Sequence, residues 1–135
     1  MLLVDTNLIV PLFVRTARSG VARDLLEFDG LWRTEPLALI EFSNVLATYQ
    51  RSRYITAETA RDCLARAESW LRPLLFSIRN EAVLDLAVRY KVTAYDARFL
   101  ALADELGSRL VTEDARLRAA APSLTQSIRD ALDSA

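Results

Sequence analysis

Residues 2–7, with the sequence LLVDTN, determine how the rest of the chain is interpreted. The run Leu2, Leu3 and Val4 is continuously apolar and stops at Asp5, which predicts a short strand that is buried on both faces. Strands of this kind belong to parallel sheets covered by helices. A carboxylate directly after such a strand should lie at the carboxyl edge of the sheet, where α/β folds place their functional sites.

Segments with apolar residues at helical spacing alternate with short apolar runs along the rest of the chain. Helices are predicted over residues 7–14, 19–28, 37–51, 56–72, 80–90 and 93–106 and in an alanine-rich stretch that ends at Pro122; strands are predicted over 31–35 and 109–112. The predicted N-caps are Ser19, Thr56, Asn80 and Thr93, and Gly107 is the predicted C-terminal stop of the helix over 93–106. Crossover connections then give an α/β fold with three layers, α/β/α, around a central and mainly parallel sheet. The thirteen residues after Pro122 show no interpretable pattern.

Length and composition exclude several classes of protein. The 135 residues, 52% of them apolar or aromatic and 26% charged, indicate one globular domain over residues 1–135 rather than a disordered chain. There is no histidine, which excludes Ser-His-Asp catalysis and histidine zinc sites. Cys63 is the only cysteine, so neither a disulfide within the chain nor a cysteine metal cluster can form. Any chemistry must therefore come from carboxylates, hydroxyls, amides or arginine.

No segment has the character of a membrane span or a signal peptide. The longest apolar run, Leu8–Val14, is far shorter than the roughly 18 residues that a spanning helix needs. Met1 is followed directly by apolar residues, without the basic region of a signal peptide. We expect a cytoplasmic protein without membrane association, in keeping with its single free thiol.

Four carboxylates occupy positions that surface acids seldom take. Asp5 and Asp114 follow predicted strands and should project at the carboxyl edge of the sheet. Asp96 is predicted to share a helix face with Phe99, Leu100 and Ala103, and Glu41 lies beside apolar residues on the inward side of its own helix. An uncompensated carboxylate is costly at such a position. A divalent cation explains the four together, since Mg²⁺ and Mn²⁺ prefer hard oxygen ligands.

Each of these acids, taken singly, also has an ordinary explanation. Asp5 and Asp114 can cap the helices that follow them. Asp96, three residues after Thr93, can be the acid of a capping box, and an arginine can neutralise a buried carboxylate. If instead two cations bind the four acids, they can clamp a phosphate group and lower the pKa of a bound water for in-line attack on a phosphodiester. That chemistry needs no histidine.

The LLVDTN stretch resembles the first motif of the PIN-domain ribonucleases, and in particular of the VapC-type toxins of bacterial toxin–antitoxin pairs. The remaining landmarks of that family follow in order: Glu41 with Asn44, the sequence AYDA at residues 94–97, and LVTED at residues 110–114. The similarity covers essentially the whole chain.

This resemblance implies a PIN-like fold and a Mg²⁺- or Mn²⁺-dependent endoribonuclease that cleaves RNA by metal-activated water. Asp5 and Asp96 would be the primary metal ligands. The full catalytic and metal-binding set would be Asp5, Glu41, Asp96 and Asp114. The supporting hydroxyl and amide groups would come from Thr6, Asn7, Asn44 and Thr112, with Asn44 helping to orient Glu41.

The resemblance also implies partners: an RNA substrate, a second copy in a homodimer, and a small VapB-like antitoxin in a groove beside the active site. The run Leu8–Phe13 and the helix around Cys63–Trp70 are apolar enough to supply such surfaces, although core packing explains most large apolar side chains.

The basic residues are unevenly distributed between lysine and arginine. All but one of the 17 are arginine, which suits phosphate contacts but equally fits a compositional bias, and a net charge of −1 does not indicate a broad basic surface. Arg15, Arg18 and Arg98 lie close in sequence to the site segments and are candidates for phosphate contacts.

Two other classes of α/β protein fit this sequence less well than a nuclease does. A phosphotransfer receiver needs adjacent acids after the first strand and a late lysine, and an aspartyl phosphatase needs a second Asp where Asn7 stands, so both are disfavoured. The alternative that stays open is a catalytically silent PIN-like module that binds protein or RNA. An intact set of four acids argues against it.

Overall fold

The computed structural model describes residues 1–134, which surround a short parallel sheet. Its strands are β1 (Leu2–Val4), β2 (Trp32–Arg33), β3 (Leu110–Val111) and β4 (Thr125–Gln126), in the order β2-β1-β3-β4. Leu3 sets the register, because it is the partner of Arg33 on one side and of Leu110 on the other. Since all pairs are parallel, the carboxyl ends of the strands meet at one edge, as predicted.

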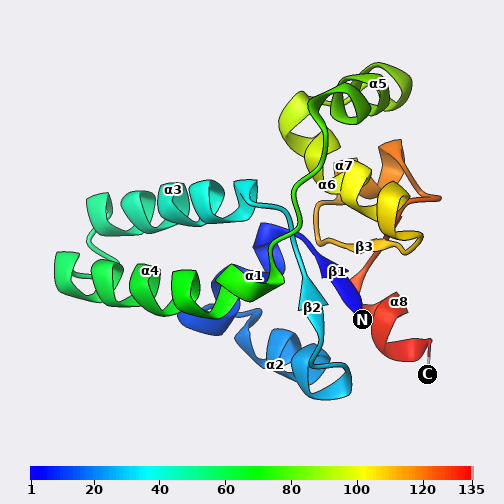
Figure 1. The fold of residues 1–135 in the computed structure, drawn as a ribbon. Helices are drawn as coiled ribbons and strands as arrows, with labels where there is room; N and C mark the ends of the chain where they lie inside the picture. The colour runs from blue at the N-terminus through cyan, green and yellow to red at the C-terminus, as the bar shows by residue number, and fades with distance from the viewer. Residues whose placement is uncertain (135) are drawn as a thin grey trace.

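Helices connect these strands (Figure 1). They are α1 (Thr6–Phe13), α2 (Ser19–Phe28), α3 (Leu37–Arg51), α4 (Ala57–Leu71), the 3-10 turn η1 (Arg72–Leu74), α5 (Asn80–Tyr90), α6 (Ala94–Leu106), α7 (Ala115–Ala120) and α8 (Ile128–Asp133). In the sheet, β2 lies on one side of β1, whereas β3 and β4 lie on the other side. Because parallel strands are joined by right-handed connections, α1 and α2 lie on one face of the sheet and α6 and α7 on the opposite face. The predicted α/β fold with a central parallel sheet is confirmed.

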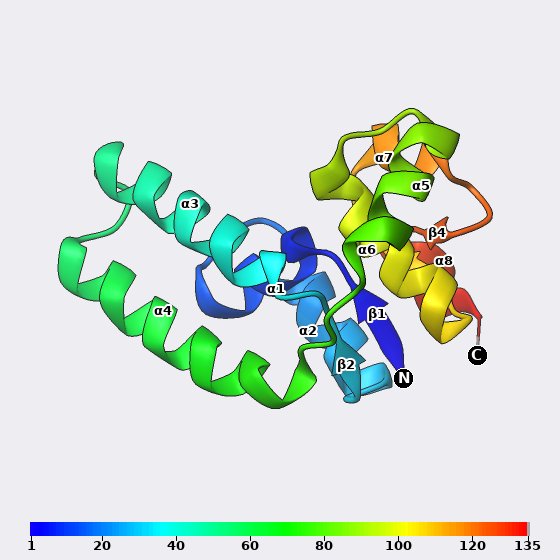
Figure 2. The ribbon, with the colours of Figure 1, turned by 45° about the horizontal axis from the view of Figure 1, so that its top comes forward.

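The helices form two groups that separate as they leave the sheet. α3 packs mainly against α4 and α1, whereas α6 packs mainly against α5 and β3. In Figure 2 the α3–α4 pair extends away from the α5–α6 pair, with β1 between them. The strand order reverses beside β1, and ligands bind at such a switch point in open α/β sheets.

Local capping signals predicted several helix ends correctly. The Thr56 hydroxyl accepts a hydrogen bond from the Thr59 amide at the start of α4, and the Thr93 hydroxyl accepts one from the Asp96 amide at the start of α6. Gly107 ends α6 with a φ of 64°, a left-handed conformation that costs glycine little.

Two predicted caps are wrong, because tertiary partners use the side chains. Ser19 lies inside α2, and its hydroxyl donates to the Pro11 carbonyl instead of capping the helix. Asn80 is the first residue of α5, and its Oδ1 accepts from Arg98. The predicted strand over 31–35 is also shorter than expected, because the backbone of Thr34 forms an isolated bridge with Leu75 instead of extending β2.

The tail after Pro122 contains β4 and α8, which the sequence did not indicate. β4 pairs with the open edge of β3, where the Leu110 amide donates to Leu124 and the Thr112 amide to Gln126. α8 then packs on α2 and buries Ile128. A two-residue strand is too short to show a periodicity, so its position depends on the edge that it covers.

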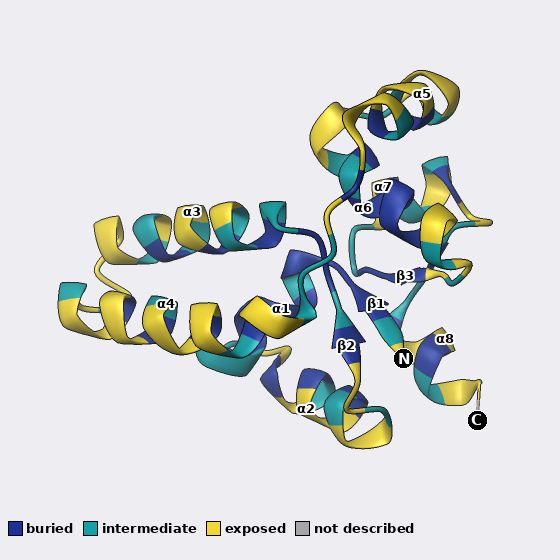
Figure 3. Ribbon diagram, viewed as in Figure 1, coloured by how far each residue is buried: buried dark blue, intermediate teal, exposed yellow. Residues whose placement is uncertain are grey.

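The core runs through the sheet and the inner faces of the helices (Figure 3). Its largest fully buried side chains include Trp32, Phe42 and Phe99. Each such side chain contributes roughly 1.5–3 kcal/mol through removal from water. None of the helices in residues 1–134 has the length and hydropathy needed to cross a membrane.

Candidate active site

A pocket of about 530 Å³ lies at the carboxyl edge of β1 and β3. Its walls come from the start of α1, the first half of α3, the first turn of α6 and the loop before α7. The four predicted acids all line it: Asp5, Glu41, Asp96 and Asp114. Thr6, Asn7 and Asn44 line it as well, so tertiary structure brings together residues that are far apart in the sequence.

Asp5 is the most buried of the four acids, with 9% of its surface exposed. It caps α1, because its Oδ1 accepts a 2.7 Å hydrogen bond from the Thr6 amide. Its Oδ2 accepts one of 2.7 Å from the Thr112 hydroxyl and a longer one of 3.4 Å from Asn7. The Asp5 carboxylate is therefore held by groups on α1 and on the segment after β3.

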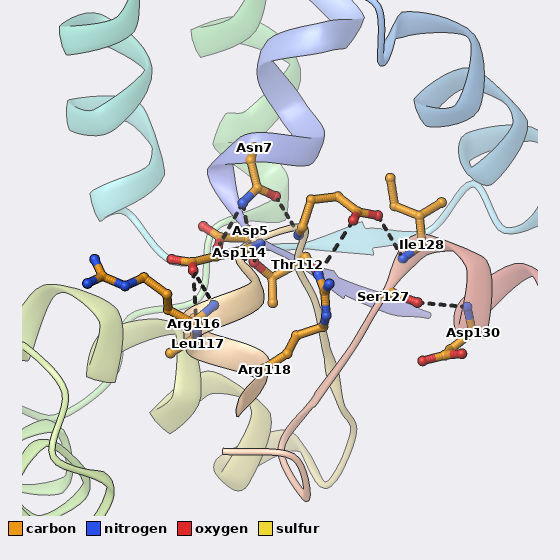
Figure 4. Close-up of polar contacts among 11 residues, drawn as sticks. Asp5, Asn7, Thr112, Asp114, Arg116, Leu117, Arg118, Ser127, Ile128 and Asp130 are labelled. Carbon is orange, nitrogen blue, oxygen red and sulfur yellow. Dashed lines mark hydrogen bonds and ion pairs between the residues drawn. The ribbon is translucent and has the colours of Figure 1, made fainter. Parts of the chain in front are cut away.

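Thr112 makes hydrogen bonds through its hydroxyl to several groups in this part of the site (Figure 4). Its side chain is fully buried, and its Oγ1 also accepts hydrogen bonds from the Asp114 amide at 3.1 Å and from Asn7 at 3.3 Å. Asn7 completes the link, since its Oδ1 accepts from the Glu113 amide at 3.2 Å. One hydroxyl thus ties Asp5 to the backbone of Asp114.

Asp114 combines its pocket position with the predicted capping role. Its Oδ1 accepts hydrogen bonds from the amides of Arg116 and Leu117 at the start of α7 (Figure 4). Arg118, one turn along, donates to the Thr112 carbonyl at 2.7 Å and is paired with Glu113. The capping explanation and the pocket explanation therefore hold together for this residue.

Glu41 is half-buried and is held from α1. The Thr6 hydroxyl donates a 2.6 Å hydrogen bond to its Oε1. Asn44 was the residue expected to orient Glu41, but it is exposed, and within residues 1–134 no hydrogen bond joins the two side chains. Asn44 lies one helical turn away along α3, and its carbonyl is bound by Thr48.

Asp96 lies at the edge of the buried face of α6 rather than within it. The residues predicted to share its face, Phe99, Leu100 and Ala103, are fully buried, whereas Asp96 is only half-buried. Two large apolar side chains that sequence reasoning did not select stand beside it at the pocket: Tyr95 is 67% exposed and Ile40 on α3 is 68% exposed.

The electrostatics of the pocket are those of an acidic cluster without a counter-charge. Of the ion pairs found in residues 1–134, none includes any of the four acids. The pKa of Asp5 is raised to about 6, mainly by burial and to a lesser extent by the nearby Glu41 and Asp96 carboxylates, although the hydrogen bonds from Thr112 and Thr6 act to lower it. Burial and the negative charge of Asp96 likewise raise the pKa of Glu41. Burial and the negative charge of Asp114 raise the pKa of Asp96.

The donor set fits a hard divalent cation by its chemistry. All the candidate ligands are carboxylate, hydroxyl or amide oxygens, and Mg²⁺ is usually held by one or two carboxylates while it keeps several waters. As the side chains stand, residues 1–134 contain no preformed cluster of three or more acids at metal-binding distance. The fit is therefore to a partly hydrated ion rather than to an all-protein cage.

An ion pair next to the site was missed by sequence reasoning. Glu35, predicted as the last residue of a strand, is 1% exposed, and its Oε1 accepts a 2.7 Å hydrogen bond from Arg98. Arg98, one of the candidates for phosphate contacts, donates hydrogen bonds to Glu35, Asn80 and the Ile78 carbonyl in this structure, so its role toward RNA stays a prediction. No local pattern relates residues 63 positions apart, so the pair had no signal in the sequence.

A second pocket, of about 650 Å³, adjoins the first and shares Asn7, Val10 and Val45 with it. Its other side chains include Arg18 and Tyr49. Of the predicted partner surfaces, Leu8 and Cys63 belong to the core, whereas Leu12, Phe13 and Trp70 line a separate pocket of about 410 Å³ between α1, α2 and α4.

Comparisons with known proteins agree on one family. The sequence profile of the PIN domain matches residues 2–122. Ribonuclease VapC3 from Pyrobaculum aerophilum is 30% identical over 126 residues, which are 91% of this chain and 96% of that protein. The crystal structure of PAE2754 from Pyrobaculum aerophilum has a TM-score of 0.72 at 22% identity and covers 97% of this chain and 92% of its own, which is a likeness of fold.

Proposed function

Because the chain belongs to the PIN-domain family, we propose that it is a Mg²⁺- or Mn²⁺-dependent endoribonuclease and the toxin of a VapBC-type toxin–antitoxin pair. The observation that carries the proposal is the convergence of four carboxylates, none paired with a cation within residues 1–134, on one pocket at the sheet edge. Ribonuclease VapC3, which aligns with this chain over almost its whole length, supports the proposal.

The roles follow from burial and from hydrogen bonds. Asp5 and Asp96 would hold the cation, and Asp114 and Glu41 would complete its shell or bind its waters. Such a cation, when bound, stabilises negative charge on a phosphate and makes water a better nucleophile at neutral pH. Thr112 would keep Asp5 in one rotamer through its 2.7 Å bond.

Glu41 is the acid best suited to receive a proton. Thr6 occupies Oε1, so Oε2 is the atom that is available to a water or a ribose hydroxyl. Burial and the negative charge of Asp96 raise its pKa, which makes Glu41 a stronger base than an ordinary glutamate and suits it to act as a general base. The second pocket, with Arg18 at its wall, would take the nucleotides beside the cleaved bond.

The partners are proposed on the same basis. The pocket formed by Leu12, Phe13 and Trp70 would receive an apolar segment of an antitoxin. Exposed apolar side chains on α3 and α5, such as Ile40 and Val88, would contribute to a homodimer. The protein would act on RNA in the cytoplasm, without membrane association.

The test is cleavage of cellular RNA by the purified, partner-free protein in Mg²⁺ or Mn²⁺. EDTA and Asp96→Asn should each abolish discrete cleavage. Asp104→Asn is the matched control, because Asp104 is an exposed acid on the same helix, and it should cleave like the wild type. Cleavage that survives both EDTA and Asp96→Asn would overturn the assignment of the site.

The outcome also separates the nuclease from a silent binding module. If the wild type binds Mn²⁺ but does not cut bulk RNA, the substrate is a narrow class of RNA and defined RNAs should be tried. If it neither binds Mn²⁺ nor cleaves, the PIN-like fold serves as a binding module, and the four acids have lost their catalytic use.

A further inference from the structure

The Glu35–Arg98 ion pair lies just outside the acidic pocket and joins the two helices that carry pocket acids. Glu35 lies two residues before α3, and its Oε2 accepts a 2.6 Å hydrogen bond from the amide of Leu37, the first residue of that helix. Glu41 follows one turn later on α3. Arg98 lies on α6, two residues after Asp96. The pair therefore spans the distance between the elements that present Glu41 and Asp96.

Arg98 uses all three of its guanidinium nitrogens at this junction. Nε donates to Glu35 at 2.7 Å, Nη1 to Oδ1 of Asn80 at 2.9 Å, and Nη2 to the Ile78 carbonyl at 3.2 Å. These partners belong to the start of α3, the start of α5 and the segment before α5. A planar, five-donor group is suited to fixing several segments at once, which lysine cannot do.

Few other contacts fix α3 relative to α6. α3 packs mainly against α4 and α1, and α6 mainly against α5 and β3. Figures 1 and 2 both show α3 extending away from α6. The separation of Glu41 from Asp96 therefore depends on this polar junction more than on apolar packing between their helices.

Stability gives little reason for such a pair. A buried ion pair pays much of its Coulombic gain back as desolvation, and apolar replacements of both partners are often equally stable. Glu35 is almost completely buried, whereas Arg98 is a quarter exposed. A contact with little net benefit to folding is better explained by the geometry that it imposes.

We propose that Glu35 and Arg98 are positioning residues that hold Asp96 against Glu41 and thereby set the affinity of the pocket for a divalent cation. This inference rests on the proposed function, because it takes the pocket to be a cation site. Neither residue lines the pocket, so both act through the helices that they join.

The test uses a variant that removes the pair without leaving a buried charge. Arg98→Met alone would strand the Glu35 carboxylate, so the informative variant is Glu35→Gln with Arg98→Met, in which the glutamine oxygen can still accept from the Leu37 amide. The matched control is Glu68→Gln with Arg72→Met, which removes an exposed 3.1 Å pair between α4 and η1 by the same substitutions. Arg98→Lys replaces the double variant if that protein does not fold.

Two measurements decide the outcome: the Mn²⁺ dissociation constant by calorimetry, and amide hydrogen exchange in the first turns of α3 and α6 in EDTA. We expect the pair variant to bind Mn²⁺ at least about tenfold more weakly, as for other groups that orient metal ligands, and to exchange faster in both turns. The control should match the wild type in both measurements. Wild-type affinity and exchange in the pair variant would overturn the inference alone, whereas a wild type that binds no Mn²⁺ would overturn it together with the proposed cation site.

Discussion

The Thr6 hydroxyl donates a 2.6 Å hydrogen bond to Oε1 of Glu41, although 35 residues separate the two. Thr6 is the first residue of α1, and Glu41 lies in the second turn of α3, so the bond joins two helices at the pocket. Hydrogen bonds to an ionised acceptor are shorter and stronger than neutral ones. This bond orients a half-buried carboxylate that has no cationic partner in the described part of the chain.

Replacement of Thr6 by valine should raise the pKa of Glu41 further, because the lost hydrogen bond stabilises the charged form. The free energy of unfolding at pH 8 should fall by about 1–2 kcal/mol. Carbon NMR titration of the Glu41 carboxyl group and urea unfolding would measure the two effects. The control is Thr48→Val, at an exposed position of α3, the helix that carries Glu41. It should change neither the pKa of Glu41 nor the free energy of unfolding. An unchanged Glu41 titration would contradict the role given to Thr6.

The metal-free protein should become more stable as the pH falls from 7.5 to 5. The pKa of Asp5 is about 6 in the folded protein and 3.8 when unperturbed, so the folded state binds the proton more tightly. The ionised Asp5 carboxylate destabilises the folded state fully above about pH 7, and this effect disappears as the pH falls through 6 toward 4. From Asp5 alone we expect a gain of about 1 kcal/mol between pH 7.5 and pH 5.

The raised pKa values of Glu41 and Asp96 act in the same direction. Asp29 acts in the opposite direction, because its pKa is lowered in the folded protein. Its contribution to stability is lost only below pH 5, outside the range considered. Urea unfolding in EDTA at the two pH values tests the prediction, and Asp5→Asn should flatten the dependence. A lower unfolding midpoint at pH 5 than at pH 7.5 would be the contrary result.

Mn²⁺ should stabilise the wild type, by roughly 3 kcal/mol when its concentration is 100 times the dissociation constant. Asp96→Asn should remove this increase in thermal stability. Without metal the same variant should be as stable as the wild type or more so, because it loses repulsion from Asp114. Asp104→Asn should respond to Mn²⁺ like the wild type. Loss of folding in Asp96→Asn would show that Asp96 serves the fold rather than the site.

Thr112→Val should weaken both the fold and the site. The fully buried hydroxyl serves Asp5, Asn7 and the Asp114 amide, so its loss should cost roughly 1–3 kcal/mol in unfolding free energy. Thr125→Val is a matched control on the neighbouring strand, because Thr125 is buried and donates to the Ala121 carbonyl. Both variants should be less stable, but only Thr112→Val should bind Mn²⁺ more weakly. Equal Mn²⁺ affinity in the two would count against Thr112 as a support of the site.

The tail beyond residue 122, where the family match ends, should be essential for stability. Ile128 is 2% exposed and α8 packs on α2, so Ile128→Ala should cost about 2–4 kcal/mol. Leu84→Ala, at a position that is 62% exposed on α5, should change the free energy of unfolding by no more than about 0.5 kcal/mol. Comparable urea midpoints for the two variants would mean that α8 contributes little to the core.

The sequence by itself determined the features that depend on near neighbours. An apolar run that ends at Asp5 is both a buried strand and a helix cap, and Thr56, Thr93 and Gly107 mark helix ends through contacts within a turn. The four acids could be selected because each interrupts a local pattern, either after a strand or beside an apolar stripe. Such signals can be recognised in the sequence alone because the two interacting residues lie within a few positions of each other.

Only the tertiary structure decided which distant groups meet. Thr6, rather than the nearby Asn44, bonds Glu41; Arg98 neutralises Glu35 instead of facing solvent; and the tail becomes β4 because β3 offers an unpaired edge. Each of these outcomes selects one hydrogen-bonding partner from many of the same chemical type. The selection depends on where packing places the backbone, and local propensity carries no information about that.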